Sequence, residues 1–371
     1  MVVEIHLLAQ SIMENKNSIS VIGCGNVGVA IAADLSYNGH KVTIVKTSKT
    51  NEGVFNKIRA NDNCIFLKEN GKYDIAKVFD LTHDLTSIAN SDVVIITIQS
   101  TYHESLIQSI SKYLNENQIV IIVCSYMSSF YFKKYCSSLP TIVETTGPYL
   151  EGRIEEKDID GQIVFRVGCR LTRGPLSILQ QERTKECMEK IHKLYKGFSN
   201  DYSVIESALL NPNMVIHTIG SVMSIPRIEY SKGNFCMYRE AYARGNEATM
   251  QILLKLDEEK KNVLKKLGCR PIDIFKAGGF LGDPVESFYS YSESSDRAIS
   301  PTSVKSRYIT EDVPQGLVLL ESIAKEIGVD VPVATSLINL SEVALGCNFR
   351  ESGRTIQKLN AVDYIKQYAR L

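Results

Sequence analysis

The sequence predicts an α/β protein in which a domain of alternating strands and helices is followed by an all-helical domain. Near the start of the chain an apolar run leads through a glycine turn directly into a helix-forming stretch. Apolar runs of strand length then recur up to Gly197–Ser203, and beyond that region apolar residues recur at helical spacing. The length of 371 residues exceeds what one hydrophobic core usually supports, which favours two domains.

The glycine turn lies in Ile19-Ser-Val-Ile-Gly-Cys-Gly-Asn-Val-Gly-Val-Ala-Ile-Ala33, which is typical of a buried strand, a tight turn and a helix in succession. Gly23 and Gly25 have no Cβ, so the main chain can approach a pyrophosphate, and Gly28 lets the helix pack on the strand. The first N–H groups of the helix would face the phosphates. A mere tight turn is the alternative. The pattern predicts a dinucleotide site with contacts from Gly23, Gly25, Asn26, Val27 and Gly28.

The second predicted strand, Lys41–Val45, ends in Lys46-Thr47-Ser48-Lys49 and has no acidic residue there. In NAD sites an Asp or Glu at this place binds the ribose 2′-hydroxyl, whereas cationic and hydroxyl groups accommodate a 2′-phosphate. We therefore predict NADP as the cofactor, with NAD as the open alternative, and place Lys46, Ser48 and Lys49 at the phosphate. An ordinary solvated basic turn is the competing interpretation.

The rest of the first half continues in the same alternation. We predict helices over Val27–Tyr37 and Tyr102–Leu114, a hairpin at the domain edge over Cys64–Phe79 with its turn at Asn70-Gly71, and buried parallel strands over Asp92–Ile98, Ile119–Cys124 and Thr141–Thr145. Gln162–Gly168 alternates and should extend the sheet. Pro175–Tyr195 should form a long helix that closes the domain.

Polar residues follow the predicted strands at their carboxyl ends. In a doubly wound sheet that edge faces the cofactor, so Thr97, Ser100 and Thr101 should line the nicotinamide half of the site. Thr146-Gly147-Pro148-Tyr149 should lie at the same edge, and Tyr149 is a candidate to bind substrate.

The second half is helical in pattern. We place the domains at 1–200 and 201–371, with the boundary in the small and polar residues Gly197–Ser203. Helices are predicted over Tyr238–Leu267, Val313–Ile327 and Pro332–Leu345, each stopped by a glycine: Gly268, Gly328 and Gly346. Tyr289–Ser303, rich in Ser and Tyr, should be a mobile loop.

Composition restricts the class of partner. The chain has 42 Lys and Arg and 42 Asp and Glu, without a long block of one sign, so neither nucleic acid nor a membrane surface is indicated. Nine scattered cysteines without a C-x-x-C pair favour reduced thiols over disulfides or a metal site. The stretch Met1–Leu8 carries Glu4 and predicts neither a signal peptide nor a membrane span. We expect a cytoplasmic protein with small-molecule partners and no metal.

Hydride transfer to a carbonyl or imine needs a proton donor, and histidine is the first candidate near neutral pH. His217 follows Asn211-Pro212-Asn213, in which Asn211 can cap a helix and Pro212 can take its first position. The i, i+4 spacing places Asn213 and His217 on one helix face. A lone histidine buried in a helix core is the alternative. For the other five histidines we prefer structural roles: His6, His40, His83, His103 and His192.

Five elements together resemble the octopine/nopaline (opine) dehydrogenase family. They are the glycine turn, Thr146–Tyr149 with Asn211-Pro-Asn-Met-Val-Ile-His217, Ser306-Arg-Tyr-Ile-Thr-Glu-Asp-Val-Pro-Gln-Gly-Leu317, and Gly353-Arg-Thr355. The resemblance covers almost the whole chain. It implies an N-terminal Rossmann dinucleotide-binding domain followed by an all-helical C-terminal domain. It also implies that His217 and Asp312 form the catalytic dyad and that Arg307 helps hold the substrate.

The chain departs from the family pattern at two places. Ser125-Tyr-Met-Ser-Ser129 replaces a glycine-rich turn expected after the fifth strand, and His217 is followed by Thr218 rather than proline. Both departures bear on the substrate more than on the reaction. Candidate substrate-binding residues are Asn213, Tyr149 and Arg307, with Tyr238 and Arg239 as further polar candidates.

The implied activity is the NAD(P)H-dependent reductive condensation of an amino acid with an α-keto acid such as pyruvate, in which a CH–NH bond is formed. Reduction of a plain keto acid, in the manner of ketopantoate reductases, is the second hypothesis. That family would present a lysine near the start of the second domain, where this chain has Asn213 and His217. A nucleotide-sensing binding protein without turnover is the third. A homodimer through the helical domains is expected.

Overall fold

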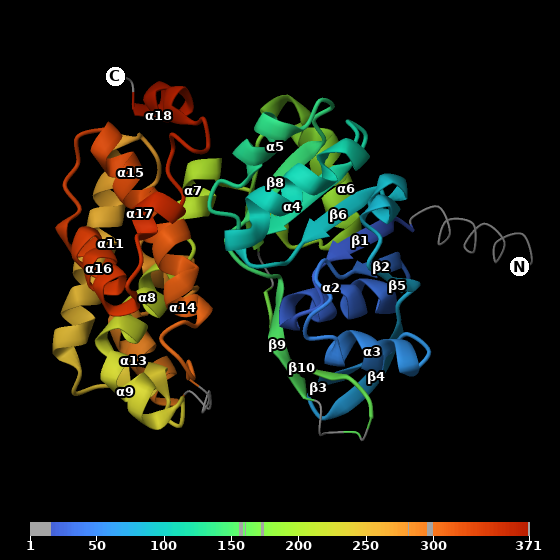
Figure 1. Ribbon diagram of the computed structural model, residues 1–371, viewed down its shortest axis with the longest axis horizontal. Helices are drawn as coiled ribbons and strands as arrows, with labels where there is room; N and C mark the ends of the chain where they lie inside the picture. Colours follow the sequence, from blue (N-terminus) through green and yellow to red (C-terminus); the bar gives the residue numbers. More distant parts are fainter. Residues whose placement is uncertain are drawn as a thin grey trace, which may run out of the picture. The chain divides into compact units, whose positions relative to one another are not determined.

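The computed structural model describes residues 16–155, 159, 161–171, 174–280, 282–294 and 300–369 (Figure 1). The predictions about Met1–Leu8 and His6 fall outside the described residues. The chain divides into two compact units. The first comprises the described residues of Met1–Ile98, Tyr102–Ser125 and Tyr131–Val204; the second comprises those of Gln99–Thr101, Tyr126–Phe130 and Ile205–Leu371.

An eight-stranded sheet forms the centre of the first unit, in the order β12-β11-β8-β7-β6-β1-β2-β5. Its strands are β1 (Ser18–Ile22), β2 (Lys41–Val45), β5 (Asp80–Thr82), β6 (Val93–Ile96), β7 (Ile119–Val123), β8 (Thr141–Thr145), β11 (Gly174–Ile178) and β12 (Phe198–Asn200). All neighbours from β5 to β8 are parallel, and β11 runs antiparallel to β8. The order reverses at β1, so the predicted doubly wound α/β fold is confirmed.

Helices of the first unit connect these strands. They are α2 (Asn26–Tyr37), α3 (Gly53–Ala60), α4 (His103–Ile110) and α6 (Thr184–Leu194), with short 3₁₀-helical segments at η1 (Leu85–Asn90), η3 (Ser111–Tyr113) and η4 (Gln181–Arg183). The segment η2 (Ser100–Tyr102) begins in the second unit, which includes Gln99–Thr101. Helix α5 (Ser129–Tyr135) follows β7, and α7 (Val204–Leu209) begins where the first unit ends. Strands β6 and β7 are buried along their whole length, as a sheet covered on both faces requires.

A second sheet of four strands lies in the same unit, in the order β4-β3-β10-β9. Its strands are β3 (Cys64–Glu69), β4 (Lys72–Lys77), β9 (Leu150–Glu155) and β10 (Val164–Arg170). The predicted hairpin is β3 and β4, whose turn has positive φ at Asn70 and Gly71. The prediction that Gln162–Gly168 extends the main sheet is wrong, because β10 pairs with β3 and β9 instead. Alternation of apolar and polar residues indicates which face of a strand is buried, but it does not indicate which strand is its neighbour.

The predicted long helix Pro175–Tyr195 is also wrong in its first part. Residues Gly174–Ile178 form β11, and the helix proper, α6, begins only at Thr184. A short apolar run is compatible with either state, and pairing with β8 and β12 decides it here. The same pairing makes a strand, β12, within the predicted boundary segment Gly197–Ser203.

The second unit is built of helices. They are α8 (Asn213–Met223), α9 (Ile225–Ser231), α10 (Met237–Tyr242), α11 (Glu247–Lys266), α12 (Ile274–Ala277), α13 (Pro284–Ser294), α14 (Arg307–Thr310), the π-helical turn η5 (Asp312–Leu317), α15 (Val318–Glu326), α16 (Pro332–Leu345), α17 (Phe349–Ser352) and α18 (Val362–Ala369). Helix α8 is buried from Met214 to Val222 and packs on α10, α11, α14, α16 and η5. The all-helical second domain is confirmed.

One helix prediction and one loop prediction in this unit need correction. Tyr238–Leu267 is not one helix, because Gly245, with a φ of +96°, breaks it between α10 and α11. The predicted mobile loop Tyr289–Ser303 begins inside α13, which continues to Ser294, and residues 295–299 lie outside the described part. The predicted stops hold: Gly268, Gly328 and Gly346 all have positive φ directly after a helix.

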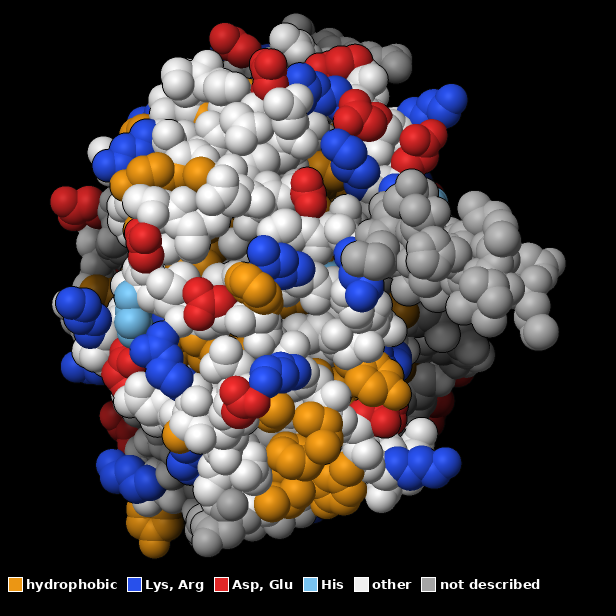
Figure 2. Space-filling model, turned by 90° about the vertical axis from the view of Figure 1, so that its right-hand side faces the viewer, with side chains coloured by type: hydrophobic (Ala, Val, Ile, Leu, Met, Phe, Trp, Pro, Cys, Tyr) orange, Lys and Arg blue, Asp and Glu red, His pale blue; other side chains and the backbone are white. Residues whose placement is uncertain are grey.

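Among the described residues, no helix is long and apolar enough to cross a membrane. On the face drawn in Figure 2, lysine and arginine side chains are interspersed with acidic ones rather than gathered into one region. This mixture agrees with the equal numbers of the two signs in the sequence.

Candidate active site

The glycine turn joins strand β1 to helix α2 against the end of strand β6. Gly23 has a φ of +124°, and a Cβ there would clash with Thr97 Oγ1. A Cβ on Gly28 would clash with the carbonyl of Gly23. The Thr97 hydroxyl donates to the carbonyl oxygen of Ile22 at 2.9 Å. Two glycines and one threonine therefore hold this turn in a shape that other residue types would disrupt.

The second glycine of the turn, Gly25, is exposed. A Cβ on Gly25 would meet no protein atom within 4 Å, and α2 begins at the next residue, Asn26. A pyrophosphate needs this close approach to main chain and to a helix N-terminus, so the turn fits a dinucleotide. The Asn26 side chain is used within the unit, since its Oδ1 accepts the N–H of Ile154 at 2.8 Å. Val27 is half-buried.

In the basic turn after β2, the first lysine, Lys46, forms hydrogen bonds within the turn itself. Lys46 is only 8% exposed, and its Nζ donates to Ser48 O, Ser48 Oγ and Thr50 O at 2.7, 3.0 and 2.6 Å. Its ammonium also lies 3.5 Å from Glu52 Oε1. Lys49 is exposed. Ser48 and Lys49 are thus exposed, while Lys46 and the Ser48 hydroxyl bond within the turn.

The other residues predicted from strand ends have different surroundings. Ser100 is buried in the second unit, where its N–H and hydroxyl both donate to Glu311 Oε1 at 2.7 and 2.8 Å. Thr101 is exposed. In the first unit, the Tyr149 ring stacks on Tyr195 with 4.2 Å between ring centroids. Their roles at the cofactor and the substrate stay predictions.

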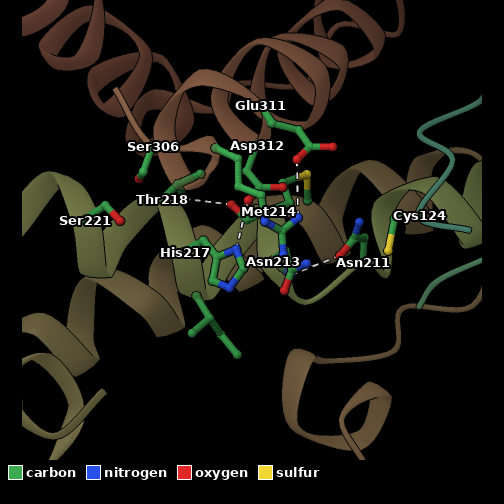
Figure 3. A network of polar contacts seen from close by, with 12 residues as sticks. Cys124, Asn211, Asn213, Met214, His217, Thr218, Ser221, Ser306, Glu311 and Asp312 are labelled. Atoms are coloured by element: carbon green, nitrogen blue, oxygen red, sulfur yellow. Dashed lines mark hydrogen bonds and ion pairs between the residues drawn. The ribbon is translucent and has the colours of Figure 1, made fainter. Parts of the chain in front are cut away.

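His217 and Asp312 lie together in the second unit although 95 residues separate them (Figure 3). The distance from His217 Nδ1 to Asp312 Oδ2 is 2.9 Å, and the two side chains are 5% and 2% exposed. Helix α8 carries the histidine, and the Asn211 side chain accepts the N–H of Asn213 at the start of that helix, at 3.0 Å. The sequence brings both members of the predicted pair to one buried place.

This geometry determines which nitrogen of His217 can exchange protons. A carboxylate only accepts hydrogen bonds, so Nδ1 carries the hydrogen directed at Asp312 and Nε2 is the proton-accepting nitrogen of the neutral ring. Burial lowers the pKa of His217 below its ordinary value, and Asp312 opposes that effect by stabilising the imidazolium. The free protein therefore holds a neutral imidazole near pH 7.

An aromatic ring and two charges surround the pair. Tyr308 stacks on His217 with 3.7 Å between ring centroids and 8° between planes. Arg307 lies 3.3 Å from Glu311 Oε2, and its side chain is 46% exposed, which leaves part of the guanidinium accessible to an anion. Asn213 is half-buried one helical turn before His217. Elsewhere in the unit, Tyr238 is buried among aromatic rings.

The segment that carries Asp312 has an unusual helical geometry. Residues Asp312–Leu317 form a π-helical turn between α14 and α15. Pro314 has no N–H to continue the regular ladder, and single π turns of this kind are frequent at functional sites. The turn is fully buried, from Asp312 to Leu317.

Sequence reasoning missed two residues that bond into this centre. The Tyr126 hydroxyl donates to Asp312 Oδ1 at 2.8 Å, and Arg354 donates to the carbonyl oxygens of Tyr126 and Ser100 at 2.7 and 2.8 Å. Tyr126 stands in the segment Ser125–Ser129, and Arg354 lies in the Gly353–Thr355 element. Both were therefore visible in the sequence, but nothing in their spacing pointed to Asp312.

The other described histidines make bonds typical of structural roles. His83, His103 and His192 each place a ring nitrogen 2.8 to 3.1 Å from a backbone carbonyl oxygen, and the Nδ1 of His40 accepts the N–H of Asn17. Within the described ranges, no group of three His, Cys, Asp or Glu side chains could hold a metal ion.

Comparison with known families divides the chain as the fold does. Residues 200–345 match the family model described as NAD/NADP octopine/nopaline dehydrogenase, alpha-helical domain. Residues 19–124 match the family model described as ketopantoate reductase PanE/ApbA. The second match lies in the dinucleotide-binding half, and the first includes both His217 and Asp312.

Relatives of full length point to the same family. The chain is 23% identical to an opine dehydrogenase of Arthrobacter sp. over 94% of this chain and 96% of the relative. It is likewise 23% identical to vitopine synthase of Allorhizobium ampelinum over 93% and 95%. Among solved structures, yersinopine dehydrogenase with NADP+ bound has a TM-score of 0.72 at 13% identity, covering 96% of this chain and 99% of that one.

A dinucleotide-binding α/β domain joined to a helical domain with a buried His–Asp pair defines an NAD(P)-dependent oxidoreductase. Residues 200–345 match the octopine/nopaline dehydrogenase family model, and the relatives that the chain matches over nearly its whole length include an opine dehydrogenase. Similarity to a ketopantoate reductase structure is more distant, with a TM-score of 0.56 at 14% identity over 95% of this chain and 100% of that one.

Proposed function

We propose that this protein is an opine dehydrogenase that uses NADPH to condense an amino acid with an α-keto acid such as pyruvate. The observation that carries the proposal is the buried His217–Asp312 pair, 2.9 Å apart, with the arginine Arg307 beside it. The names of the relatives, opine dehydrogenase and vitopine synthase, support the same reaction class.

The reaction forms one C–N bond and one C–H bond. The amine nitrogen of the amino acid attacks the keto carbon, the carbonyl oxygen leaves as water, and the resulting imine carbon is reduced to a secondary amine. The nicotinamide supplies the hydride when NADPH is bound, and one proton is consumed for each turnover. The acid–base residue must therefore protonate the departing oxygen.

We assign that proton transfer to His217 Nε2, because Nδ1 is committed to Asp312. As imidazolium it would donate to the carbonyl or hydroxyl oxygen as negative charge develops, and such catalysis typically contributes about 10²–10⁴-fold. Asp312 would fix the tautomer and stabilise the cation. Asn213, on the same helix face as His217, is a candidate to bind the substrate.

Arg307 is the residue that we assign to a substrate carboxylate. A guanidinium can bind a carboxylate through two parallel hydrogen bonds, which an ammonium cannot reproduce. The variant Arg307→Lys should raise KM for the keto acid by about tenfold, since about 1.4 kcal/mol of binding corresponds to that factor. Affinity for NADPH should stay unchanged. An unaltered KM would instead indicate that Arg307 has a structural role, such as its ion pair with Glu311.

The preference for NADPH over NADH rests on the turn after β2. Lys49 and Ser48 are exposed there, and Lys46 holds the turn in shape. Both cofactors occur among similar structures, since yersinopine dehydrogenase was solved with NADP+ and octopine dehydrogenase with NADH. The residues of this chain favour the phosphorylated form.

One assay tests the proposed function. Oxidation of NADPH is followed with keto acid alone and then with keto acid plus each amino acid. An opine dehydrogenase requires the amino acid for turnover, and mass spectrometry should find the secondary amine product. Turnover with keto acid alone would support the ketopantoate-reductase alternative, which the match of residues 19–124 favours. Binding of NADPH without turnover on any pair would support a nucleotide sensor.

Three further features belong to the proposal. The domains are 1–200 and 201–371, the protein works in the cytoplasm, and its partners are small molecules rather than nucleic acid or membrane. A homodimer through the helical domains is supported by Leu340 and Val343 of α16, which are 52% and 84% exposed. Sedimentation equilibrium would give the mass, and a mass near 41.4 kDa would contradict the dimer.

A further inference from the structure

Tyr126 lies in the turn after β7, and its side chain reaches the His217–Asp312 pair. The ring is 1% exposed, and the hydroxyl donates to Asp312 Oδ1 at 2.8 Å. The other oxygen, Oδ2, faces His217 Nδ1 at 2.9 Å. Both oxygens of the carboxylate are therefore engaged, one by a phenol and one by the imidazole.

The backbone around Tyr126 is in a conformation that favours glycine. Cys124, Tyr126 and Met127 have φ values of +58°, +49° and +61°, which are costly for residues with a Cβ. Such conformations persist only where the surroundings hold them. Arg354 does so, because its guanidinium donates to Tyr126 O at 2.7 Å and Ser128 Oγ at 2.8 Å.

Arg354 is itself a buried cation, 1% exposed, and it bonds three separate main-chain or side-chain oxygens in the second unit. The third is Ser100 O at 2.8 Å, and Ser100 in turn donates to Glu311, the residue before Asp312. One arginine thus fixes both the turn that carries Tyr126 and the residue that bonds Glu311.

The π-helical turn η5 is shaped to accept these partners. A Cβ on Gly316 would lie only 3.1 Å from the Tyr126 ring, so glycine there allows the ring to approach. A Cβ on Gly353 would clash with Pro314, whose carbonyl oxygen accepts the Arg354 N–H at 2.9 Å. The segment that presents Asp312 therefore also contacts Tyr126 and Arg354.

We propose that Tyr126 is a positioning residue for the His217–Asp312 pair and that Arg354 holds Tyr126 in place. This inference rests on the proposed acid–base role of His217. By binding Oδ1, the phenol keeps Oδ2 on Nδ1, and the imidazole then presents Nε2 to the substrate. The phenol also withdraws charge from the carboxylate, which weakens the attraction of Asp312 for a proton on His217.

The first test measures His217 in the protein without substrates. Nitrogen-15 NMR of labelled histidine reports the tautomer and the pKa of each ring, and His217→Ala identifies the signal. Tyr126→Phe removes the donor, so the pKa of His217 should rise. Arg307 and Glu311, the other charged groups that face the ring, stay in place.

The matched control is Tyr242→Phe. The Tyr242 hydroxyl is also buried and donates to Ile216 O at 2.6 Å, next to His217 in the chain, but it has no bond to Asp312. This variant should lose stability without moving the pKa of His217. An unchanged or lowered pKa in Tyr126→Phe, or an equal rise in Tyr242→Phe, would overturn the inference. Because no turnover is involved, these outcomes do not depend on the proposed reaction.

The second test is a kinetic cycle with the full enzyme. Tyr126→Phe should lower kcat about tenfold, as loss of a hydrogen bond to a charged group does, and leave KM for both substrates within about twofold. In an Asp312→Asn background the same substitution should cost nothing further, since Tyr126 acts only through Asp312. An equal loss in both backgrounds would show that Tyr126 acts elsewhere.

The third test concerns Arg354. Arg354→Lys keeps the positive charge but removes the branched guanidinium that bonds several oxygens at once. We therefore expect kcat to fall and the pKa of His217 to move in the same direction as in Tyr126→Phe. The control is Arg350→Lys in α17, the helix just before Arg354, whose arginine bonds Glu321 and Glu342. It should lose stability and leave both quantities unchanged. If Arg354→Lys and Arg350→Lys behave alike, Arg354 is structural only.

Discussion

Two turns that follow strands of the main sheet solve the same backbone problem in opposite ways. After β1, the left-handed position is held by Gly23, with a φ of +124°. After β7, Cys124, Tyr126 and Met127 hold comparable positions without a glycine. The first turn depends on its own residues and on Thr97 beside it. The second depends on Arg354, more than 220 residues further along the chain.

The difference separates local from long-range encoding. A glycine turn after an apolar run can be recognised from the sequence, because the requirement and the residue that meets it are neighbours. In a turn of non-glycine residues, the positive φ values cannot be recognised from the local sequence, because the arginine that stabilises them lies far along the chain. The first arrangement suits a site that binds a constant group, the pyrophosphate. The second delivers a tyrosine hydroxyl to Asp312.

The largest expected effects concern the pair at the second turn. His217→Ala should lower kcat by roughly 10²-fold or more, the scale for losing a positioned acid–base group. Asp312→Asn should also be severe, because the amide can select the wrong tautomer. The double variant should be little worse than the worse single variant, since the residues act as a unit. Steady-state kinetics measure all three, and additive losses would separate the two residues.

The same pair predicts a pH dependence with a definite sign. Burial lowers the pKa of His217, so the profile of kcat/KM against pH should have a limb below the ordinary imidazole value of about 6.5. In opine oxidation the neutral ring is the base, and kcat/KM should fall as pH decreases through that limb. In the reductive direction the imidazolium is the acid, and kcat/KM should fall as pH increases through it. The limb should disappear in His217→Ala.

The fold and the pair were predictable from the sequence for identifiable reasons. β1, the glycine turn and α2 are contiguous, so their pattern could be recognised locally. His217 was a candidate from its place after a helix start, whereas Asp312 and its pairing with His217 were predicted only through the resemblance of two distant elements to one family. β10 was assigned to the wrong sheet because apolar alternation does not indicate which strand is the neighbour. β11 was predicted as part of a helix because a short apolar run is compatible with either state. The hydrogen bond of Tyr126 to Asp312 was not predicted, because the sequence of the turn after β7 does not show which distant residue its side chain contacts.

The second largest effect should come from the first turn. Gly28→Ala places a Cβ against the carbonyl of Gly23, which must shift, and overpacking of this kind costs about 1–3 kcal/mol. NADPH should therefore bind at least about tenfold more weakly in a fluorescence titration. Gly53→Ala is the control, because a Cβ there meets nothing within 4 Å. Equal affinity in the two variants would remove the turn from the cofactor site.

A smaller effect should distinguish the two cofactors at the end of β2. Lys49→Ala should lower kcat/KM for NADPH by roughly tenfold, the scale of one charge-assisted contact, and leave the value for NADH unchanged. Lys72→Ala, an exposed lysine on β4, should alter neither value. If Lys49→Ala lowers both values equally, the 2′-phosphate does not bind there.

The smallest expected effect compares the two turns directly, through one cysteine in each. At ordinary positions alanine is more stabilising than glycine by about 0.5–1 kcal/mol, because glycine loses more backbone freedom on folding. Cys124 has a φ of +58°, whereas Cys24, in the glycine turn, is not among the residues with positive φ. Glycine should therefore be more stable than alanine at Cys124 only, and alanine should be the more stable residue at Cys24.

We expect Cys124→Gly to be more stable than Cys124→Ala by about 1 kcal/mol, since glycine avoids the cost of the left-handed conformation while both lose the same sulfur. Cys24→Ala should be more stable than Cys24→Gly. Urea unfolding of the four variants without cofactor gives both differences. If alanine is the more stable residue at both positions, the turn after β7 carries no strain, and Arg354 would then have nothing to hold there beyond its hydrogen bonds.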